Sequence, residues 1–218
     1  MIAIIDSGIG GKGIEAEIRK IMPGVDIIYF ADTKNFPYGT KTVSELHRIL
    51  EHNIRVLIKK GATVIVLACN SATVSSVDHL RRKFDIPVIG TEPAIKPACE
   101  STKTKNIAIF STPITAESQD HLIKKYCEGV KVYKIPFDYL AAEIERGDIE
   151  VAKSDIQNIW KKYRGKNIDT IVLGCTHYTL IRDEIQKIVG RDIKLIDSNS
   201  AVAQQVKKVY DEINSKQK

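Results

Sequence analysis

The sequence contains little that suggests a membrane-bound, secreted or nucleic-acid-binding protein. No apolar run is long enough to cross a bilayer, because Asp, Lys, Gly or Asn interrupts each candidate segment. The four cysteines include no C-x-x-C pair, and residues 1–5 resemble a strand more than a secretory leader. Aromatic residues make up only 6%, and no basic cluster is interleaved with them. We therefore expect free thiols in a reducing cytoplasm, and no membrane or nucleic-acid partner.

What the sequence does contain is enough apolar residues for a substantial core. Hydrophobic residues are 43% of 218 positions, which suits one large domain or two small ones. The formal net charge of +6 comes from lysines and arginines scattered over several predicted helices. This scatter is typical of solvated helix faces, with a mild attraction for anionic small molecules.

Short β-branched runs alternate with longer helical stretches along the chain. This alternation is typical of parallel sheets with crossover helices, an α/β fold. Residues 43–60 carry apolar side chains on one stripe and end at Gly61, so they are predicted to form an amphipathic helix. A terminal helix is predicted over residues 202–213. Eight strands are predicted, over residues 2–5, 26–31, 63–68, 87–90, 106–110, 131–135, 170–174 and 194–196.

The two halves of the sequence resemble each other. Three segments of the first half recur in the same order in the second half at nearly one offset, which favours two copies of one unit over chance similarity between strands. The matched pairs are 3–7 with 108–112, 65–69 with 171–175, and 85–90 with 192–197.

The duplication predicts two similar parallel-sheet α/β domains related by pseudo-twofold symmetry. We place the first at residues 1–93 with 203–218, and the second at 94–202. Ligands of open α/β sheets lie beyond the carboxyl ends of the strands. An active site is therefore predicted in the cleft between the domains.

Cys69 and Cys175 both follow apolar strands, at positions where ligands bind in such folds. If the domains face each other, the two thiols point at one another. Inversion of an α-carbon requires a base on one face and an acid on the other, and two like groups serve in both directions. A thiol suits this task because its ordinary pKa, roughly 8.5, is readily lowered by nearby positive charge or a helix N-terminus.

The residues after each thiol supply such surroundings. Asn70 and Ser71 are natural N-cap residues ahead of a helix predicted over 72–84, and Thr176 and His177 follow the second cysteine. The alternative is that both cysteines are small buried hydrophobic residues. We adopt that alternative for Cys99 and Cys127, which have no such context. A zinc site of Cys69, Cys175 and His177 is disfavoured, because only the last two are closely spaced ligands.

A glycine-rich loop follows the first predicted strand. The run from Gly8 to Gly13 satisfies G-x-G-x-x-G, and Asp32 lies near the end of the second strand, so a dinucleotide site is one interpretation. Asp6 at the strand end would repel a pyrophosphate, and the paired cysteines would be left unexplained. We favour a small zwitterion, with backbone amides and the Ser7 hydroxyl on its carboxylate and Asp6 on its ammonium.

A second turn, Pro37-Tyr38-Gly39-Thr40, is predicted after the second strand. Its amides are further candidates for binding the zwitterion. Taken alone, the same segment would be interpreted as an ordinary loop.

The motifs in combination resemble the glutamate racemases of the aspartate/glutamate racemase superfamily, over nearly the whole chain. They are Asp6-Ser7-Gly8-x-Gly10-Gly11, Pro37-Tyr38-Gly39-Thr40-Lys41, Cys69-Asn70-Ser71-Ala72 and Gly174-Cys175-Thr176-His177-Tyr178.

The resemblance implies a two-domain α/β isomerase that interconverts L- and D-glutamate for peptidoglycan without pyridoxal phosphate or a metal. It also implies a homodimer. By the same resemblance Cys69 acts on the D-isomer and Cys175 on the L-isomer, and Asp6 and His177 are auxiliary catalytic groups. The implied substrate-binding residues are Asp6, Ser7, Pro37, Tyr38, Gly39, Asn70, Ser71, Thr115, Thr176 and His177.

The sequence departs from the family pattern at several positions. Ser71 stands where the family usually has threonine, and His121 where it has tyrosine. The segment after Pro136 leaves open whether Glu143 or Glu145 matches the family's glutamate. Two alternatives also remain open: a racemase of aspartate or another acidic amino acid, and a non-catalytic amino-acid-binding homologue.

Overall fold

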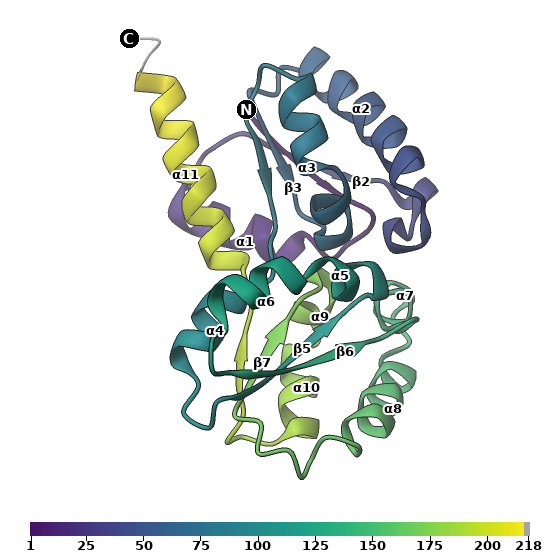
Figure 1. Cartoon of the computed structure of the whole chain (residues 1–218). Coiled ribbons are helices and arrows are strands. Elements are labelled where there is room, and N and C mark those ends of the chain that lie inside the picture. The colour runs from purple at the N-terminus through teal and green to yellow at the C-terminus, as the bar shows by residue number, and fades with distance from the viewer. Residues whose placement is uncertain (216–218) are drawn as a thin grey trace. The chain divides into compact units, whose positions relative to one another are not determined.

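The computed structural model describes residues 1–215, which form two α/β units (Figure 1). Unit 1 comprises Met1–Glu92 and the chain from Ser198 on, and unit 2 comprises Pro93–Asp197. The sequence analysis placed the return of the chain to unit 1 at residue 203. In the structure the chain returns earlier, at Ser198. The reason is that helix α11 (Asn199–Ser215) belongs to unit 1 from its first turn.

Unit 1 is built on a four-stranded parallel sheet with strand order β2-β1-β3-β4. Two short 3₁₀ turns, η1 and η2, lie between β2 and α2. In addition to α11, the elements of unit 1 are β1 (Ile2–Asp6), α1 (Lys12–Ile21), β2 (Ile27–Ala31), η1 (Thr33–Asn35), η2 (Tyr38–Thr40), α2 (Val43–Lys59), β3 (Val64–Leu67), α3 (Asn70–Lys83) and β4 (Val88–Gly90).

Helices cover both faces of this sheet. Helices α2 and α3 pack on one face, where Leu50 and Ile54 join Ile5 and Leu67 in a buried cluster. Helices α1 and α11 pack together on the other face. The predicted amphipathic helix is confirmed as α2, which begins with a capping box between Thr42 and Glu45.

Unit 2 repeats the plan, with strand order β6-β5-β7-β8 in a second parallel sheet. Its elements are α4 (Ile95–Ser101), β5 (Asn106–Ser111), α5 (Pro113–Ser118), α6 (Asp120–Tyr126), β6 (Lys131–Pro136), α7 (Leu140–Arg146), α8 (Ile149–Trp160), β7 (Thr170–Leu173), α9 (Thr176–Leu180), α10 (Arg182–Val189) and β8 (Lys194–Ile196).

The sheet of unit 2 also has helices on both faces. Helices α7 to α10 cover one face, where Phe110, Leu140 and Trp160 are buried together. Helices α4 and α6 cover the other face. All eight predicted strands are present, and the α/β class with two similar parallel-sheet domains is confirmed.

The expectation of four free thiols is wrong. Cys99 and Cys127 are buried, as predicted, but they form a disulfide between α4 and the residue after α6, with their Cα atoms 5.3 Å apart. The sequence offered no C-x-x-C pair because the partners lie 28 residues apart and are brought together only by packing. Cys69 and Cys175 carry free thiols.

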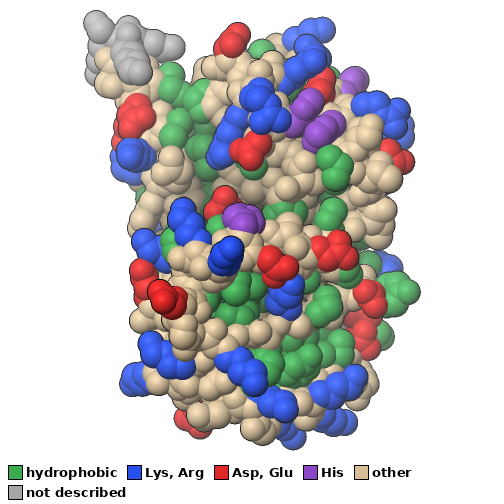
Figure 2. All heavy atoms as spheres, viewed as in Figure 1, with side chains coloured by type: hydrophobic (Ala, Val, Ile, Leu, Met, Phe, Trp, Pro, Cys, Tyr) green, Lys and Arg blue, Asp and Glu red, His purple; other side chains and the backbone are tan. Residues whose placement is uncertain are grey.

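Surface charge follows the expected scatter. On the face drawn in Figure 2, Lys and Arg side chains are interspersed with Asp and Glu. Elsewhere in the described chain, several charged side chains form ion pairs within one helix, such as Lys207 with Asp211. Among residues 1–215, no helix combines the length and the apolar character needed to cross a membrane.

Candidate active site

Cys69 and Cys175 occupy equivalent positions in the two units. Each lies two residues after the last residue of its strand, β3 or β7, and directly before a helix, α3 or α9. The backbone angles φ and ψ are −136° and 121° at Cys69, and −140° and 135° at Cys175. The two residues are only 8% and 7% exposed. Both thiols therefore lie at the carboxyl edge of a sheet, where the duplication predicted them.

The helix after Cys69 begins earlier than the sequence suggested. We predicted a helix from residue 72 with Asn70 and Ser71 as capping residues, whereas α3 begins at Asn70 and Cys69 itself is the N-cap. Asn70 uses its side-chain amide elsewhere, donating to the carbonyl of Thr91 at 3.0 Å. The partial positive charge of the helix N-terminus therefore lies directly at the cysteine.

Asp6 ends strand β1, beside the strand that leads to Cys69. The backbone amide of Ala68 donates to the carbonyl of Ile5 at 2.8 Å, which brings the two strand ends together. Asp6 is fully buried, and its Oδ2 accepts a hydrogen bond from the amide of Gly8 at 2.9 Å. That amide is one a pyrophosphate would need in a dinucleotide site. The loop geometry thus favours a small ligand.

Asp32 accepts several side-chain hydrogen bonds, whereas the sequence analysis considered it only as part of a dinucleotide site. Its buried carboxylate accepts hydrogen bonds from Tyr38 Oη at 2.8 Å, Asn53 Nδ2 at 2.9 Å and Asn35 Nδ2 at 2.9 Å. Burial, followed by the charge of Asp32, raises the pKa of Tyr38 well above its ordinary range. A signal was available in the sequence, because Asn53 is a polar residue on the apolar stripe of α2.

The residues of the turn over 37–40 differ in how deeply they are buried. The Tyr38 side chain is buried against Asp32, while Pro37 and Gly39 are partly exposed. Thr40 Oγ1 closes the turn by donating to the carbonyl of Pro37 at 3.1 Å. The hydrogen bond from Tyr38 to Asp32 therefore fixes the turn. The Tyr38 side chain points inward, so the backbone of the turn is its main outward-facing part.

In unit 2, His177 follows Cys175 by two residues and is held by a carboxylate. Its Nε2 lies 2.7 Å from Oε2 of Glu145, and the histidine side chain is only 4% exposed. Of the two glutamates that the sequence left open, one makes this contact and the other does not. Glu145 contacts His177, whereas Glu143 is buried near Asp155, and burial together with that neighbouring carboxylate raises the pKa of Glu143.

The remaining candidates of unit 2 are buried near the same edge. Thr115 in α5 is fully buried and accepts a hydrogen bond from Thr112 Oγ1 at 2.9 Å. Thr176 is the first residue of α9 and is 3% exposed. His121, at the family's tyrosine position, is exposed and its Nδ1 lies 2.9 Å from the carbonyl of Ser118.

Each unit thus brings together one part of the predicted site. Unit 1 gathers Asp6, Ser7, Cys69, Asn70 and Ser71 at the carboxyl edge of its sheet, and all five are buried. Unit 2 gathers Cys175, Thr176 and His177 at the equivalent edge, with Glu145 behind the imidazole. Each edge therefore offers one thiol together with a group able to hold or move a proton.

Comparison with known proteins agrees with this chemistry. A family model for Asp/Glu/hydantoin racemases matches residues 12–206. A glutamate racemase from Clostridium perfringens is 38% identical over 220 aligned positions, which cover 98% of this chain and 84% of the relative. The crystal structure of Escherichia coli glutamate racemase in complex with L-glutamate and the activator UDP-MurNAc-Ala has a TM-score of 0.90 at 29% identity, covering 95% of this chain and 81% of that one.

A second solved structure gives the same result. Glutamate racemase from Francisella tularensis in complex with D-glutamate has a TM-score of 0.81 at 29% identity, covering 98% of this chain and 81% of that one. The resemblance found in the motifs is confirmed by the family match, by sequence identity and by fold. This chain belongs to the Asp/Glu/hydantoin racemase family.

Proposed function

We propose that this protein is a glutamate racemase that uses Cys69 and Cys175 as a pair of opposed acid–base groups at Cα. The observation that carries the proposal is the equivalence of the two cysteines. Each is buried, lies outside any disulfide, and stands at the N-cap of the helix after the third strand of its unit. The glutamate racemases among its relatives support the substrate.

The reaction moves one proton off Cα and another onto it. With D-glutamate, the Cys69 thiolate takes the α-proton, the carbanion flattens, and the Cys175 thiol donates its proton to the opposite face. Cys69 ends as a thiol and Cys175 as a thiolate, and the L-isomer reacts by the reverse path. Asp6 beside the first strand end and His177 beside Cys175 serve as the auxiliary proton-holding groups.

Groups on the two edges suit a small zwitterion. We propose that the substrate carboxylates bind the turn over residues 37–40 and the hydroxyls of Ser7, Ser71, Thr115 and Thr176, with Asn70 beside them. In this proposal Asp6 receives the ammonium group. No pyridoxal phosphate enters this scheme, because the two thiols carry both proton transfers. The D-glutamate formed would supply peptidoglycan, and hence cell-wall biogenesis and cell shape, in the cytoplasm.

Deuterium wash-in at Cα tests the proposal. The protein in heavy water is incubated with each isomer of glutamate and of aspartate, and the α-proton signal is followed by NMR together with the optical rotation. We expect exchange and racemisation with both glutamate isomers and far slower exchange with aspartate. Faster exchange with aspartate would establish the aspartate racemase alternative. No exchange with any of the four would leave the amino-acid-binding homologue.

A further inference from the structure

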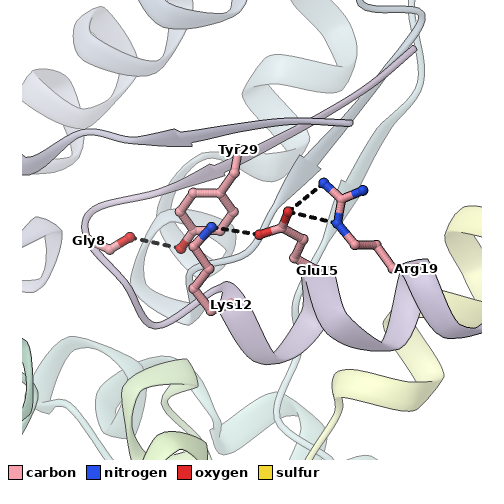
Figure 3. Close-up of polar contacts among 5 residues, drawn as sticks. All are labelled: Gly8, Lys12, Glu15, Arg19 and Tyr29. Atoms are coloured by element: carbon pink, nitrogen blue, oxygen red, sulfur yellow. Dashed lines mark hydrogen bonds and ion pairs between the residues drawn. The ribbon is translucent and has the colours of Figure 1, made fainter. Parts of the chain in front are cut away.

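A chain of side chains runs from helix α1 and strand β2 to Gly8, in the loop that follows strand β1 (Figure 3). Tyr29, on β2, donates its phenolic hydrogen to the carbonyl of Gly8 at 2.8 Å. The amide of the same glycine donates to Asp6 Oδ2 at 2.9 Å. Gly8 is therefore held at its carbonyl by Tyr29 and at its amide by Asp6.

Tyr29 is itself held by charged groups on α1. The ammonium of Lys12 lies 3.9 Å from the centroid of the Tyr29 ring and 2.7 Å from Glu15 Oε2. The other oxygen of Glu15 accepts from Arg19 Nε at 3.0 Å and Nη2 at 2.8 Å. Burial of Glu15 opposes its charge, but the hydrogen bonds from Lys12 and Arg19 outweigh it and lower the pKa of this carboxyl. Glu15 is therefore a fixed anion that holds Lys12 over the ring.

A cation over an aromatic face is attracted by the ring and withdraws electron density from it. In a tyrosine this makes the hydroxyl a stronger hydrogen-bond donor. The arrangement therefore strengthens the bond from Tyr29 to Gly8 in addition to fixing its direction. Figure 3 shows the Lys12 ammonium across the Tyr29 ring, with Glu15 to its right and Arg19 beyond Glu15.

The space around the Tyr29 hydroxyl leaves little room for movement. A Cβ atom added at Gly11 would lie 3.1 Å from Tyr29 Oη, 3.3 Å from Asp6 Cβ and 2.7 Å from Ala68 Cβ. The phenol, the Asp6 side chain and the residue before Cys69 thus meet around one glycine. A phenylalanine would fill nearly the same volume as Tyr29. Replacing Tyr29 by phenylalanine therefore removes the hydrogen bond to the Gly8 carbonyl and changes the packing little.

We propose that Tyr29 is a positioning residue for racemisation: through Gly8 it fixes Asp6 for the proton transfer at Cys69, and Lys12 strengthens its hold. This proposal rests on the proposed function, since it assigns Tyr29 to one of the two half-reactions. Removing the hydroxyl slows proton transfer at Cys69 and leaves transfer at Cys175 intact. Loss of Lys12 has the same effect in weaker form.

Steady-state kinetics of Tyr29→Phe test this with α-deuterated glutamate of each configuration. Because the equilibrium constant of a racemase is one, kcat/KM falls equally in both directions, by about tenfold for a misplaced group held by one hydrogen bond. The asymmetry appears in the isotope effects. From D-glutamate, whose α-deuteron goes to Cys69, the isotope effect on kcat/KM rises; from L-glutamate it falls.

Two other variants complete the experiment. Lys12→Met keeps the apolar stem and removes the cation, and we expect the same asymmetry with a smaller loss of kcat/KM. Tyr163→Phe makes the same chemical change in unit 2, where that ring stacks near Trp160, and we expect wild-type kinetics.

The outcomes separate the two proposals. A wild-type kcat/KM in Tyr29→Phe overturns the positioning role. A loss of activity with both isotope effects unchanged also overturns it, because such a loss reports only a smaller fraction of active protein. If the wild-type protein exchanges no α-proton with glutamate, the proposed function itself fails. Reduced kcat/KM with the opposed shifts in isotope effect supports the positioning role.

Discussion

The buried imidazole of His177 and the partly buried carboxylate of Glu145 form a pair, with Nε2 and Oε2 separated by 2.7 Å. The pair links helix α9, which follows Cys175, to helix α7 across 32 residues of sequence. A carboxylate on one ring nitrogen fixes the orientation of the ring. Glu145 thereby fixes the imidazole that follows Cys175 by two residues.

The first prediction concerns this pair. Glu145→Gln keeps an oxygen near the ring but removes the charge, and hydrogen bonds to charged groups contribute about 1.5–3 kcal/mol. We expect kcat/KM to fall by roughly 10- to 100-fold. If His177 serves the Cys175 half-reaction, the isotope effect on kcat/KM with α-deuterated L-glutamate rises, the mirror image of the effect expected for Tyr29→Phe.

Glu143→Gln is the matched control, because it makes the same change on the same helix. We expect its activity to stay within about twofold of wild type, because the carboxylate that contacts His177 is that of Glu145. Its stability provides a second check. Since the pKa of Glu143 is raised by burial and by Asp155, wild type loses stability as pH rises past the ordinary carboxyl range, and Gln lacks that loss. A large loss of activity in Glu143→Gln would contradict the assignment of Glu145.

The second prediction concerns the cysteines. Cys69→Ser and Cys175→Ser each remove one of the two transferring groups, and a hydroxyl is far less acidic than a thiol. We expect each variant to lose racemisation by about 10²- to 10⁴-fold, the usual contribution of general acid–base catalysis. The Cys99→Ser/Cys127→Ser double variant is the control, and we expect it to retain turnover. Full activity in either single variant would refute the two-base scheme.

The parts of the fold that sequence analysis predicted are those set by local patterns. Strand runs such as 64–67 and 170–173 are short and rich in β-branched residues, so their positions and the cysteines beyond them follow directly. The two units share one strand order. The match of residues 65–69 with 171–175 was therefore enough to predict equivalent positions for the two thiols.

The pairs that sequence analysis left open depend on packing between distant segments. Glu143 and Glu145 are two residues apart on a helix and so point about 200° apart, and only the position of α7 beside α9 decides which of them contacts His177. The disulfide was missed for a similar reason. Cys99 lies on α4 and Cys127 follows α6, and no local pattern relates the two helices.

A third prediction concerns that disulfide. Unfolded protein kept free of reductant should give two reactive thiols, those of Cys69 and Cys175, and four after reduction. Closing a loop across 28 residues constrains the unfolded chain, and its loss should lower the free energy of unfolding by about 3 kcal/mol. Thiol titration and denaturant unfolding with and without reductant measure both quantities. Four reactive thiols before reduction would show that the pair is reduced.

The fourth prediction concerns Asp169, at the start of β7. Its carboxylate accepts hydrogen bonds from Thr102 Oγ1 at 2.7 Å, from the amides of Lys103 at 2.6 Å and Thr104 at 2.8 Å, and from Thr170 Oγ1 at 2.8 Å. Burial opposes the charge, but these bonds outweigh it and lower the pKa from 3.8 to about 2. The folded state therefore binds the proton more weakly than the unfolded state.

A lowered carboxyl pKa stabilises the fold above the unfolded pKa, and the contribution disappears as pH falls through the folded pKa. For Asp169 the difference corresponds to on the order of 2 kcal/mol, present at pH 7 and lost between about pH 4 and 2. Asp169→Asn should lower the free energy of unfolding at pH 7 by that order, and the gap to wild type should narrow as the pH falls. Asp78→Asn, at a side chain 78% exposed, is the control and should change stability little at either pH. If the prediction is right, the difference in free energy of unfolding between wild type and Asp169→Asn does not stay constant from pH 7 to pH 2.5. A constant difference would mean that the charge of Asp169 contributes nothing, and that only its shape is needed to join the loop after α4 to β7.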